Sequence, residues 1–201
     1  LNYFVRSREN IYLIDTPILM HPRVWDASGH VENFVDPVSK CEKCGHSFRF
    51  DQIDNETICS DCGGKLSNPN NFNLMLETKM GASEETAIKT FLRPEEAQSM
   101  FVNFKNVLQS LSPKIPFGIA QIGKAFRNEI TPRDFIYRLR EFEIMEFEYF
   151  IHPSAPWESY FDNFLLEQKE WLSRIGVDVK KLHAFEHPKE GRAHYSIKTI
   201  D

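Results

Sequence analysis

The chain has 201 residues, of which 41% are hydrophobic and 26% charged, a composition typical of one globular domain with room for a small inserted module. Its formal net charge of −5 argues against broad, charge-driven nucleic-acid binding, so any RNA contact must be local. No apolar run approaches the roughly 20 residues of a membrane-spanning helix, and the first residues do not read as a signal peptide. We therefore expect a cytoplasmic protein without a membrane partner.

The first half of the chain is rich in strand-forming residues. It predicts short strands over residues 11–20, 72–79 and 88–92. Pro17 should break the first of them, and a loop containing His30 should follow it. Asn68 to Asn71 carry turn chemistry and should precede the second strand.

Four cysteines in two close pairs predict a metal site. Cys41-x2-Cys44 is followed, after fourteen intervening residues, by Cys59-x2-Cys62. In a cytoplasmic chain such pairs indicate a metal more than disulfides, because four thiolates can close a tetrahedron around Zn²⁺. Two surface disulfides or four unrelated thiols are the alternative. A closed four-sulfur site leaves no position for substrate, so the zinc should be structural.

The hydrophobic period changes at Pro94 and predicts an amphipathic helix. Apolar residues recur at three- and four-residue steps from Ala97 to Leu111. Pro94 suits a first helical turn, and Glu95 and Glu96 lie where the positive end of the helix dipole favours them. Glu95 could therefore simply serve the dipole.

A second amphipathic helix is predicted further along the chain. Its apolar stripe runs from Trp157 to Leu172, and Gly176 lies just past its end. This stripe indicates core or interface. A polar stretch follows, and the chain ends in a strand-like run.

Between the helices, residues 117–129 and 138–150 predict a long antiparallel hairpin around a polar turn at 131–134. Because side chains alternate across a strand, one face of the hairpin should carry Gln121, Gly123, Ala125, Arg127 and Glu129 from the first strand and Arg138, Arg140, Phe142, Ile144, Glu146 and Glu148 from the second. The opposite face, with Ile122, Phe126, Met145, Phe147 and Tyr149, should be structural. The polar face thus brings arginines, an aromatic ring and carboxylates together.

That polar face has the chemistry of a nucleotide site. The small Gly123 and Ala125 should leave room for a flat ligand. Phe142 offers a stacking surface, Arg127 a phosphate clamp, and Glu129 an acceptor for an exocyclic amine. A simple cross-strand surface pair of Arg127 and Glu129 is the alternative.

Several stretches carry a resemblance to a known family. Phe126–Arg133, Arg140–Phe142 and Met145–Phe150 resemble motif 2 of the class II aminoacyl-tRNA synthetases, specifically of the dimeric glycyl-tRNA synthetases. Further agreement comes from Asp15–Pro17 with Ala27–His30 and Phe34, from Phe91–Gln98, and from Ala193–Ser196. The FRNE element is shared across several class II enzymes, whereas LRPE-x-AQ and SGH are specific to the glycyl enzymes.

The resemblance implies an α+β fold, in which a class II synthetase-like antiparallel β-sheet is flanked by helices and carries an inserted zinc knuckle. Residues 1–40 would be catalytic core with part of motif 1, 41–67 the knuckle, 68–150 core with the motif 2 hairpin, and 151–201 a helical segment and the start of the next core strand. Motif 1 implies a homodimer. Motif 3 and an anticodon-binding domain would lie outside this sequence, so we expect a fragment that is incomplete for activity.

The implied reaction is the ATP-dependent ligation of glycine to tRNA(Gly) through glycyl-adenylate, with Mg²⁺ bridging the phosphates of ATP. Arg127 would be the catalytic residue that binds the α-phosphate. Glu129 would bind the adenine amino group, Phe142 would stack on adenine, and Arg138 would reach the outer phosphates.

Glu95 and Glu146 would hold the glycine ammonium in a pocket too small for larger amino acids. The chain departs from the family pattern nearby, because the family usually has Thr and Gly where Glu96 and Ser99 stand. Gly191-Arg192 also replaces a more acidic pair.

Two other functions fit parts of the same pattern. The first is another class II synthetase, such as the prolyl or threonyl enzyme, which the glutamate pair and the SGH loop disfavour. The second is a non-catalytic synthetase-like domain that binds nucleic acid or a partner. Retention of Arg127, Glu129 and Phe142 together disfavours it, since a binding-only relative need not keep an ATP site.

Overall fold

The structure is a computed structural model that describes residues 1–53, 57–132, 135–187 and 197–200. The chain divides into two compact units, one formed by Val5–Phe150 and the other by Leu1–Phe4 with Ile151–Asp201. Among the described residues, no helix has the length and apolar character needed to cross a membrane.

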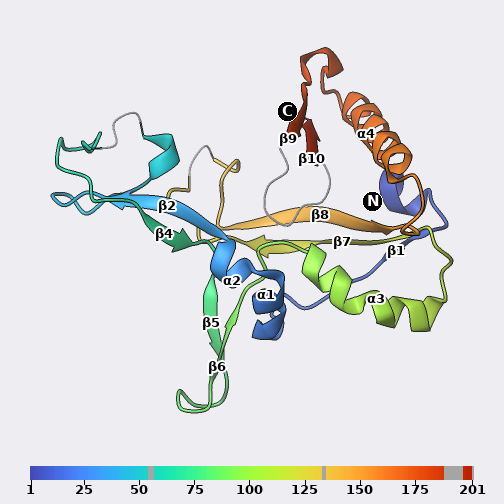
Figure 1. Ribbon diagram of the computed structural model, residues 1–201, viewed down its shortest axis with the longest axis horizontal. Coiled ribbons are helices and arrows are strands. Elements are labelled where there is room, and N and C mark those ends of the chain that lie inside the picture. The colour runs from blue at the N-terminus through green and yellow to red at the C-terminus, as the bar shows by residue number, and fades with distance from the viewer. Residues whose placement is uncertain (54–56, 133–134, 188–196, 201) are drawn as a thin grey trace. The chain divides into compact units, whose positions relative to one another are not determined.

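The larger unit is built on a three-stranded sheet in the order β1-β7-β8 (Figure 1). β7 (Phe117–Phe126) and β8 (Glu141–Phe150) form the predicted antiparallel hairpin, whereas β1 (Ile11–Leu13) runs parallel to β7. Both hairpin strands are shorter than predicted. Beyond Phe126 the Arg127 N–H still donates to the Arg140 carbonyl, but the Asn128 N–H donates to the Leu74 carbonyl, and the pairing of the two strands ends there. Of the predicted turn at 131–134, residues 133 and 134 lie outside the described part of the chain.

Helix α3 (Ala97–Leu111) packs against one face of this hairpin (Figure 1). The shared core contains Met100, Val107, Phe117 and Ile119, with Phe104 and Phe150 packed against them. The predicted helix is therefore confirmed, and so is most of its apolar stripe, although Phe101 and Leu111 are 47% and 53% exposed. The helix begins at Ala97 rather than Pro94, because the backbone of Arg93 still donates to Ile18 and accepts from Phe126.

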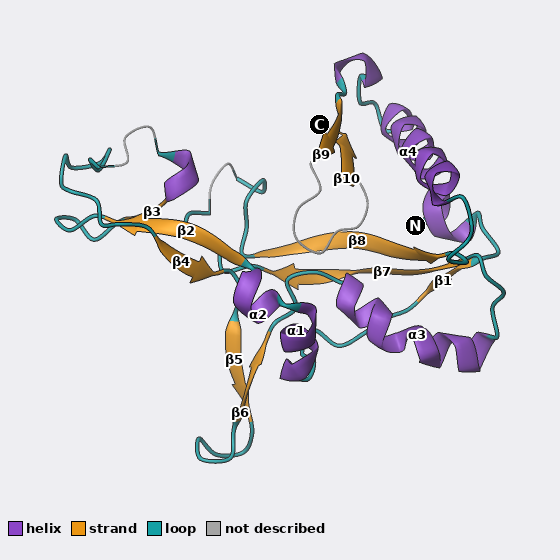
Figure 2. Cartoon of the chain, in the orientation of Figure 1, coloured by secondary structure: helices purple, strands orange, loops and turns teal. Residues whose placement is uncertain are grey.

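A second three-stranded sheet, in the order β3-β2-β4, leads to the cysteines (Figure 2). It consists of β2 (Val35–Lys40), β3 (Ser47–Arg49) and β4 (Asn70–Asn73), all antiparallel, with the short η2 (Phe50–Gln52) after β3. The predicted turn at 68–71 is only partly right, because Asn70 and Asn71 already pair with β2.

The predicted strand at 72–79 is two strands. β4 ends at Asn73, and β5 (Glu77–Met80) then pairs antiparallel with β6 (Ile88–Phe91). The Leu74 N–H still donates to the Phe34 carbonyl, next to β2, and the chain then bends where Asn73 Oδ1 accepts the Met75 N–H at 2.7 Å. The strand predicted at 11–20 is likewise reduced to β1.

The predicted loop around His30 contains two short helices, α1 (Pro22–Ser28) and α2 (His30–Asn33). They are joined by Gly29, whose φ of 80° is strained for any residue with a side chain. Trp25 of α1 is completely buried with Met75 and Phe91 in a small core. The loop is thus anchored to the β4–β6 region.

The smaller unit contains the second predicted helix. α4 spans Trp157–Arg174, and Gly176 follows it with φ 94°. The unit also contains η3 (Val179–Lys181) and the antiparallel pair β9 (Ala184–His187) and β10 (Ile197–Ile200), while η1 (Asn2–Arg6) begins the chain. The helix prediction is confirmed. The stretches 191–192 and 193–196, to which the family pattern also refers, lie outside the described residues.

Candidate active site and metal centre

The two predicted polar faces of the hairpin coincide. The β7–β8 register places Gln121 opposite Glu146, Gly123 opposite Ile144, and Ala125 opposite Phe142. Directly opposed residues of an antiparallel pair project to the same side. The register therefore places Phe142 and Glu146 on one face, which α3 covers at its other end, whereas Arg127, Glu129 and Arg138 lie outside the paired strands.

The space above Gly123 is filled by the protein itself, so the prediction that Gly123 and Ala125 leave room for a ligand is wrong. A Cβ on Gly123 would collide with the Arg93 guanidinium and lie 2.7 Å from Glu96 Oε1. Ala125 is completely buried. Glycine is needed at 123 for the close approach of these two side chains. A ligand on this face must avoid the space above Gly123 and contact the β8 side chains or Arg127 instead.

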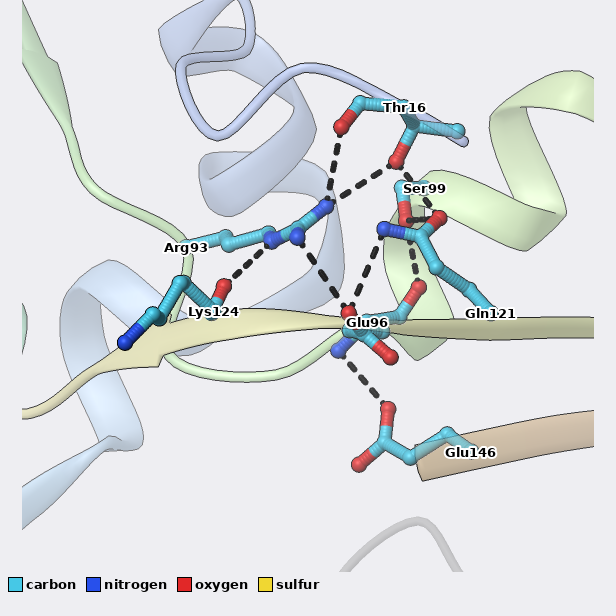
Figure 3. Close-up of polar contacts among 7 residues, drawn as sticks. All are labelled: Thr16, Arg93, Glu96, Ser99, Gln121, Lys124 and Glu146. Carbon is cyan, nitrogen blue, oxygen red and sulfur yellow. Dashed lines mark hydrogen bonds and ion pairs between the residues drawn. The ribbon is translucent and has the colours of Figure 1, made fainter. Parts of the chain in front are cut away.

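Arg93 and Glu96 form an ion pair inside the protein (Figure 3). Arg93 Nη2 lies 3.2 Å from Glu96 Oε1, and the two side chains are 2% and 0% exposed. Arg93 also donates to the Thr16 carbonyl and hydroxyl, each at 3.1 Å, and to the Lys124 carbonyl at 2.8 Å. The Gln121 amide donates to the same Glu96 oxygen at 3.3 Å. The network joins the segment between β6 and α3 to β7 and to the stretch around Thr16.

Glu96 itself is poorly satisfied for a buried carboxylate. Its Oε2 is buried without a hydrogen-bond partner among the described residues. Burial raises the pKa of Glu96 to about 7, against the opposing effect of the Arg93 charge. Sequence reasoning missed this core role, and the departure from the usual threonine at 96 was the only available signal.

The two predicted ammonium carboxylates lie beside the start of α3. Glu146 Oε2 accepts the Glu96 N–H at 2.7 Å. Glu95 Oε1 lies 3.3 Å from His30 Nε2 and 3.2 Å from Gln98 Nε2. The Glu95 carboxylate is thus bound by neighbouring side chains, and Glu95 lies before the first turn of α3, which weakens the alternative that it only serves the dipole.

These carboxylates affect one another's ionisation. For Glu95, burial opposes ionisation, but the hydrogen bond and charge of His30, the Gln98 amide and the Arg127 charge together leave its pKa lowered. Burial raises the pKa of Glu146, and the Glu95 charge adds to this effect. Glu148 follows, with a pKa raised to about 7 by burial and by the charges of Glu146 and Glu95. The site is richer in carboxylates than the predicted pair, and a cation entering it would relieve their repulsion.

The predicted phosphate ligand and stacking ring are brought together. The Arg127 guanidinium carbon lies 5.3 Å from the centre of the Phe142 ring and 5.4 Å from that of Phe34. Its Nε donates to the Pro94 carbonyl at 3.2 Å. Arg127 is therefore held between two rings at the mouth of the carboxylate cluster. The contact of Phe34, at the end of α2, with Arg127 was not predictable from the sequence, which shows Phe34 only as part of a motif.

Glu129 and Arg138 lie where the hairpin strands separate. Arg138 Nε is 4.0 Å from Glu129 Oε2, and the Arg140 side chain donates to the Glu129 carbonyl at 3.0 Å. Among the described residues, Glu129 thus forms its ion pair with Arg138 and not with Arg127. The alternative of an Arg127–Glu129 surface pair finds no support in these contacts.

The four cysteines form one cluster. The sulfur atoms of Cys41, Cys44, Cys59 and Cys62 all lie within 4.8 Å of one another, with Cys41 to Cys62 at 3.5 Å and Cys44 to Cys59 at 3.7 Å. Four thiolates at the usual zinc–sulfur distance of ~2.3 Å in a tetrahedron would be separated by about 3.8 Å. The observed separations exceed the ~2.05 Å of a disulfide and fit a shared metal ion.

The surroundings of the cluster favour a thiolate at Cys41, whereas burial and side-chain hydrogen bonds to Cys41, Cys62 and Cys59 raise the pKa of the Cys44 thiol to about 12. The Cys44 N–H donates to Cys41 Sγ at 3.4 Å, and backbone donors of this kind lower the pKa of the Cys41 thiol to about 6. A Cβ on Gly64 would lie 3.0 Å from Cys41 Sγ and 3.2 Å from Cys62 Sγ, so only glycine allows the backbone this close. These residues therefore fit a closed four-sulfur metal site.

Comparison with known proteins places this geometry in a family. The family model described as tRNA synthetase class II core domain (G, H, P, S and T) matches residues 79–200. The chain belongs to this class II synthetase family. The match begins within β5 and includes β6, α3 and the β7–β8 hairpin, so it contains every predicted ATP and glycine residue.

Two curated relatives of this class II synthetase chain are named glycine–tRNA ligase. A glycine–tRNA ligase of Treponema denticola is 46% identical over 197 residues, which is 96% of this chain and 44% of the relative. A glycine–tRNA ligase of Thermobifida fusca is 42% identical over 216 aligned residues, covering 98% of this chain and 46% of the relative. The chain thus spans less than half the length of these relatives.

Solved structures confirm the predicted class II synthetase-like α+β fold. A pyrrolysyl-tRNA synthetase of Desulfitobacterium hafniense matches with a TM-score of 0.51 and 13% identity, over 94% of this chain and 46% of the other. A threonyl-tRNA synthetase structure from Cryptosporidium parvum gives a TM-score of 0.53 and 19% identity, over 87% of this chain and 33% of the other. At these identities the likeness concerns the fold alone.

Proposed function

We propose that this chain is the part of a glycine–tRNA ligase that binds ATP and glycine, within a protein that forms glycyl-adenylate and transfers glycine to tRNA(Gly). The observation that carries the proposal is the convergence of Glu95 and Glu146 beside Arg127, which itself lies on Phe142. A cation site next to a phosphate ligand suits a substrate with an ammonium at one end and a reacting carboxylate at the other. The names of the curated relatives support the same substrate.

The glycine ammonium would be held by two carboxylates in different roles. Glu95 is favoured in its ionised form, so it supplies a full negative charge. Glu146 accepts the Glu96 N–H with Oε2, and we assign its other oxygen, Oε1, to the ammonium. A charged hydrogen bond to each carboxylate would fix the orientation of a substrate that has no side chain of its own to recognise.

Arg127 would leave its position between the rings to bind the α-phosphate. The glycine carboxylate then attacks the α-phosphorus, and pyrophosphate leaves. Little acid–base chemistry is needed, because catalysis consists of placing the two anionic reactants together and neutralising their charge. Mg²⁺ bound with ATP would neutralise charge on the outer phosphates. Phe142 would exchange its contact with Arg127 for one with adenine, with Glu129 on the amino group and Arg138 on the outer phosphates.

The same proposal extends to the metal site, the oligomeric state, the location and the domain organisation of the protein. Zinc in the cluster of Cys41, Cys44, Cys59 and Cys62 would be structural, because four thiolates leave no open position. We further propose a homodimer in the cytoplasm, and the division of the chain into core (1–40 and 68–150), knuckle (41–67) and C-terminal segment (151–201).

Amino-acid-dependent exchange of labelled pyrophosphate into ATP, measured on the full-length protein, tests this function. Glycine should support exchange, and proline, threonine, serine and alanine should not. Exchange with proline or threonine would favour the corresponding class II enzyme instead. Absence of exchange with any amino acid, in protein that is folded and contains its whole catalytic domain, would favour a non-catalytic binding domain.

A further inference from the structure

A chain of side-chain contacts reaches Glu95 from the loop between α1 and α2. Ser28 Oγ lies 2.8 Å from His30 Nδ1, and His30 Nε2 lies 3.3 Å from Glu95 Oε1. Gln98 Nε2 reaches the same carboxylate oxygen at 3.2 Å. Both recorded side-chain partners of Glu95 therefore engage Oε1, and Oε2 has no hydrogen bond in the part of the chain that the structure describes.

The fold fixes the imidazole ring of His30 from several sides. Its centre lies 5.4 Å from that of the buried Trp25 ring and 5.6 Å from that of Phe34. The Asn73 amide donates to the carbonyls of His30 and Val31, at 3.3 and 2.7 Å, and so ties the backbone to β4. The ring is largely buried, with 13% of the side chain exposed. An imidazole held this way has little freedom to turn away from Glu95.

The hydrogen-bond directions in this chain follow from the acceptor at its end. An ionised carboxylate only accepts, so His30 must carry its proton on Nε2. In the neutral ring, the Ser28 hydroxyl then donates to Nδ1. In the charged ring, Nδ1–H donates to Ser28 Oγ, which can donate to the Trp25 carbonyl at 3.2 Å. Both states of the ring thus offer an N–H to Glu95.

We propose that His30 is a positioning residue for glycine recognition, which holds Glu95 by Oε1 so that Oε2 faces the substrate ammonium. This inference rests on the proposed function. The same loop carries Phe34 against Arg127, so one anchored turn supports both the ammonium carboxylate and the phosphate ligand. His30 touches neither substrate. Its contribution is to keep a flexible carboxylate in one rotamer, ionised and pointed at the ammonium.

The test compares His30→Ala and His30→Gln with wild type in the full-length protein, by glycine-dependent pyrophosphate exchange. His30→Ala should raise the KM for glycine roughly tenfold, the usual effect of losing one hydrogen bond to a charged group. The KM for ATP should change less than about twofold on the same reasoning. His30→Gln keeps a donor of similar reach and should recover part of the glycine affinity. Asn33→Ala is the matched control, because Asn33 braces the Gly29 carbonyl in the same loop without touching Glu95.

The pH profile separates positioning from simple loop damage. The charged and titratable groups that face Glu95 are His30 from α2, Arg127 after β7, and Glu146 and Glu148 on β8. Burial raises the pKa of Glu95, and the hydrogen bond and charge of His30 lower it. Without His30 the Glu95 pKa should therefore rise. The acid limb of the pH profile of kcat/KM for glycine should then move to higher pH. Asn33→Ala should leave that limb in place.

Two results would overturn the inference while leaving the proposed function intact. One is a wild-type glycine KM and acid limb in His30→Ala. The other is a proportional rise of both KM values in His30→Ala and Asn33→Ala alike, which would make His30 a structural residue of the loop. Failure of the wild-type protein to use glycine at all would instead refute the proposed function.

Discussion

Arg127 is held by contacts that orient its side chain but that a phosphate can replace. Its guanidinium group lies between Phe34 and Phe142, and each cation–π contact contributes ~0.5–2 kcal/mol. An α-phosphate offers a stronger, charge-assisted bidentate partner. The rings therefore pre-orient the side chain without trapping it.

Replacing Arg127 should nearly abolish activation of glycine. Loss of one charge-assisted contact in a water-excluded site removes roughly 2–4 kcal/mol of transition-state stabilisation, so Arg127→Ala should slow adenylate formation by roughly 30- to 1,000-fold. The measurement is glycine-dependent pyrophosphate exchange in the full-length protein. Lys124→Ala, which removes an exposed cation from the same strand, should have little effect. Wild-type exchange by Arg127→Ala would contradict the assignment.

Glu146→Gln tests the ammonium site with little change of shape. Glutamine keeps a carbonyl oxygen that can accept the Glu96 N–H, so the start of α3 should survive while one negative charge is lost. We expect glycine use to weaken by roughly 10- to 150-fold, the effect of one charged hydrogen bond, with ATP affinity nearly unchanged. Glu143→Gln, on the exposed opposite face of β8, is the control. If Glu146→Gln keeps the wild-type glycine requirement, the carboxylate is structural.

Glu96 predicts how stability depends on pH. Its pKa is raised from 4.5 to about 7 in the folded protein, so folding favours the protonated form. The resulting stabilisation is complete below pH 4.5 and is lost as the pH rises towards 7, a change on the order of 1–3 kcal/mol. Thermal unfolding of wild type and Glu96→Gln between pH 4.5 and 8 should show a smaller fall in Tm for the variant, because it has no proton to lose at 96. Parallel curves would show that the Arg93 partner keeps Glu96 ionised throughout.

At the scale of elements, the hairpin shows what alternation alone can predict. Parity correctly placed Phe142 and Glu146 on one face, because the period of two follows from the backbone. Arg127 lies just beyond the end of β7, and its guanidinium group contacts the Phe142 ring. Parity could not show that the space over Gly123 is taken by Arg93 and Glu96, which come from a different segment of the chain. The role of His30 was hidden for the same reason, since it depends on the bend at Gly29 and on packing against Trp25.

The knuckle (residues 41–67), with its four cysteines, gives a prediction about metal content and stability. The full-length protein should contain about one zinc per chain, and strong chelators should lower its Tm, because a closed thiolate site contributes folding energy. His46→Ala is a suitable control, since His46 pairs with Asp61 at 2.6 Å beside the cluster but is not one of its four cysteines. Cys59→Ser should lose the metal, whereas His46→Ala should keep it. Metal-free protein with four titratable thiols and a Tm indifferent to chelator would rule out the zinc site.

At the scale of the whole molecule, the family was predictable because its motifs are spread along the chain. The SGH loop, the LRPE segment and the hairpin lie far apart in sequence, yet the structure joins them through Glu95, His30 and Arg127. Composition alone indicated only a globular chain with a metal-binding insertion. The lengths of the strands were less predictable, since β4 stops where Asn73 Oδ1 accepts the Met75 N–H and β7 stops where the Asn128 N–H donates to the Leu74 carbonyl.

The pairing of β2 with β4 also matters to anyone who wishes to modify this protein. Val38 lies opposite Asn70, so the two chain segments that enter and leave the cysteine module run side by side. The segment between Val38 and Asn70 therefore begins and ends at positions spaced like the two ends of a hairpin turn. A short Asn-Gly linker, or a folded reporter domain with adjacent termini, should be accepted at this place without altering the register of either strand.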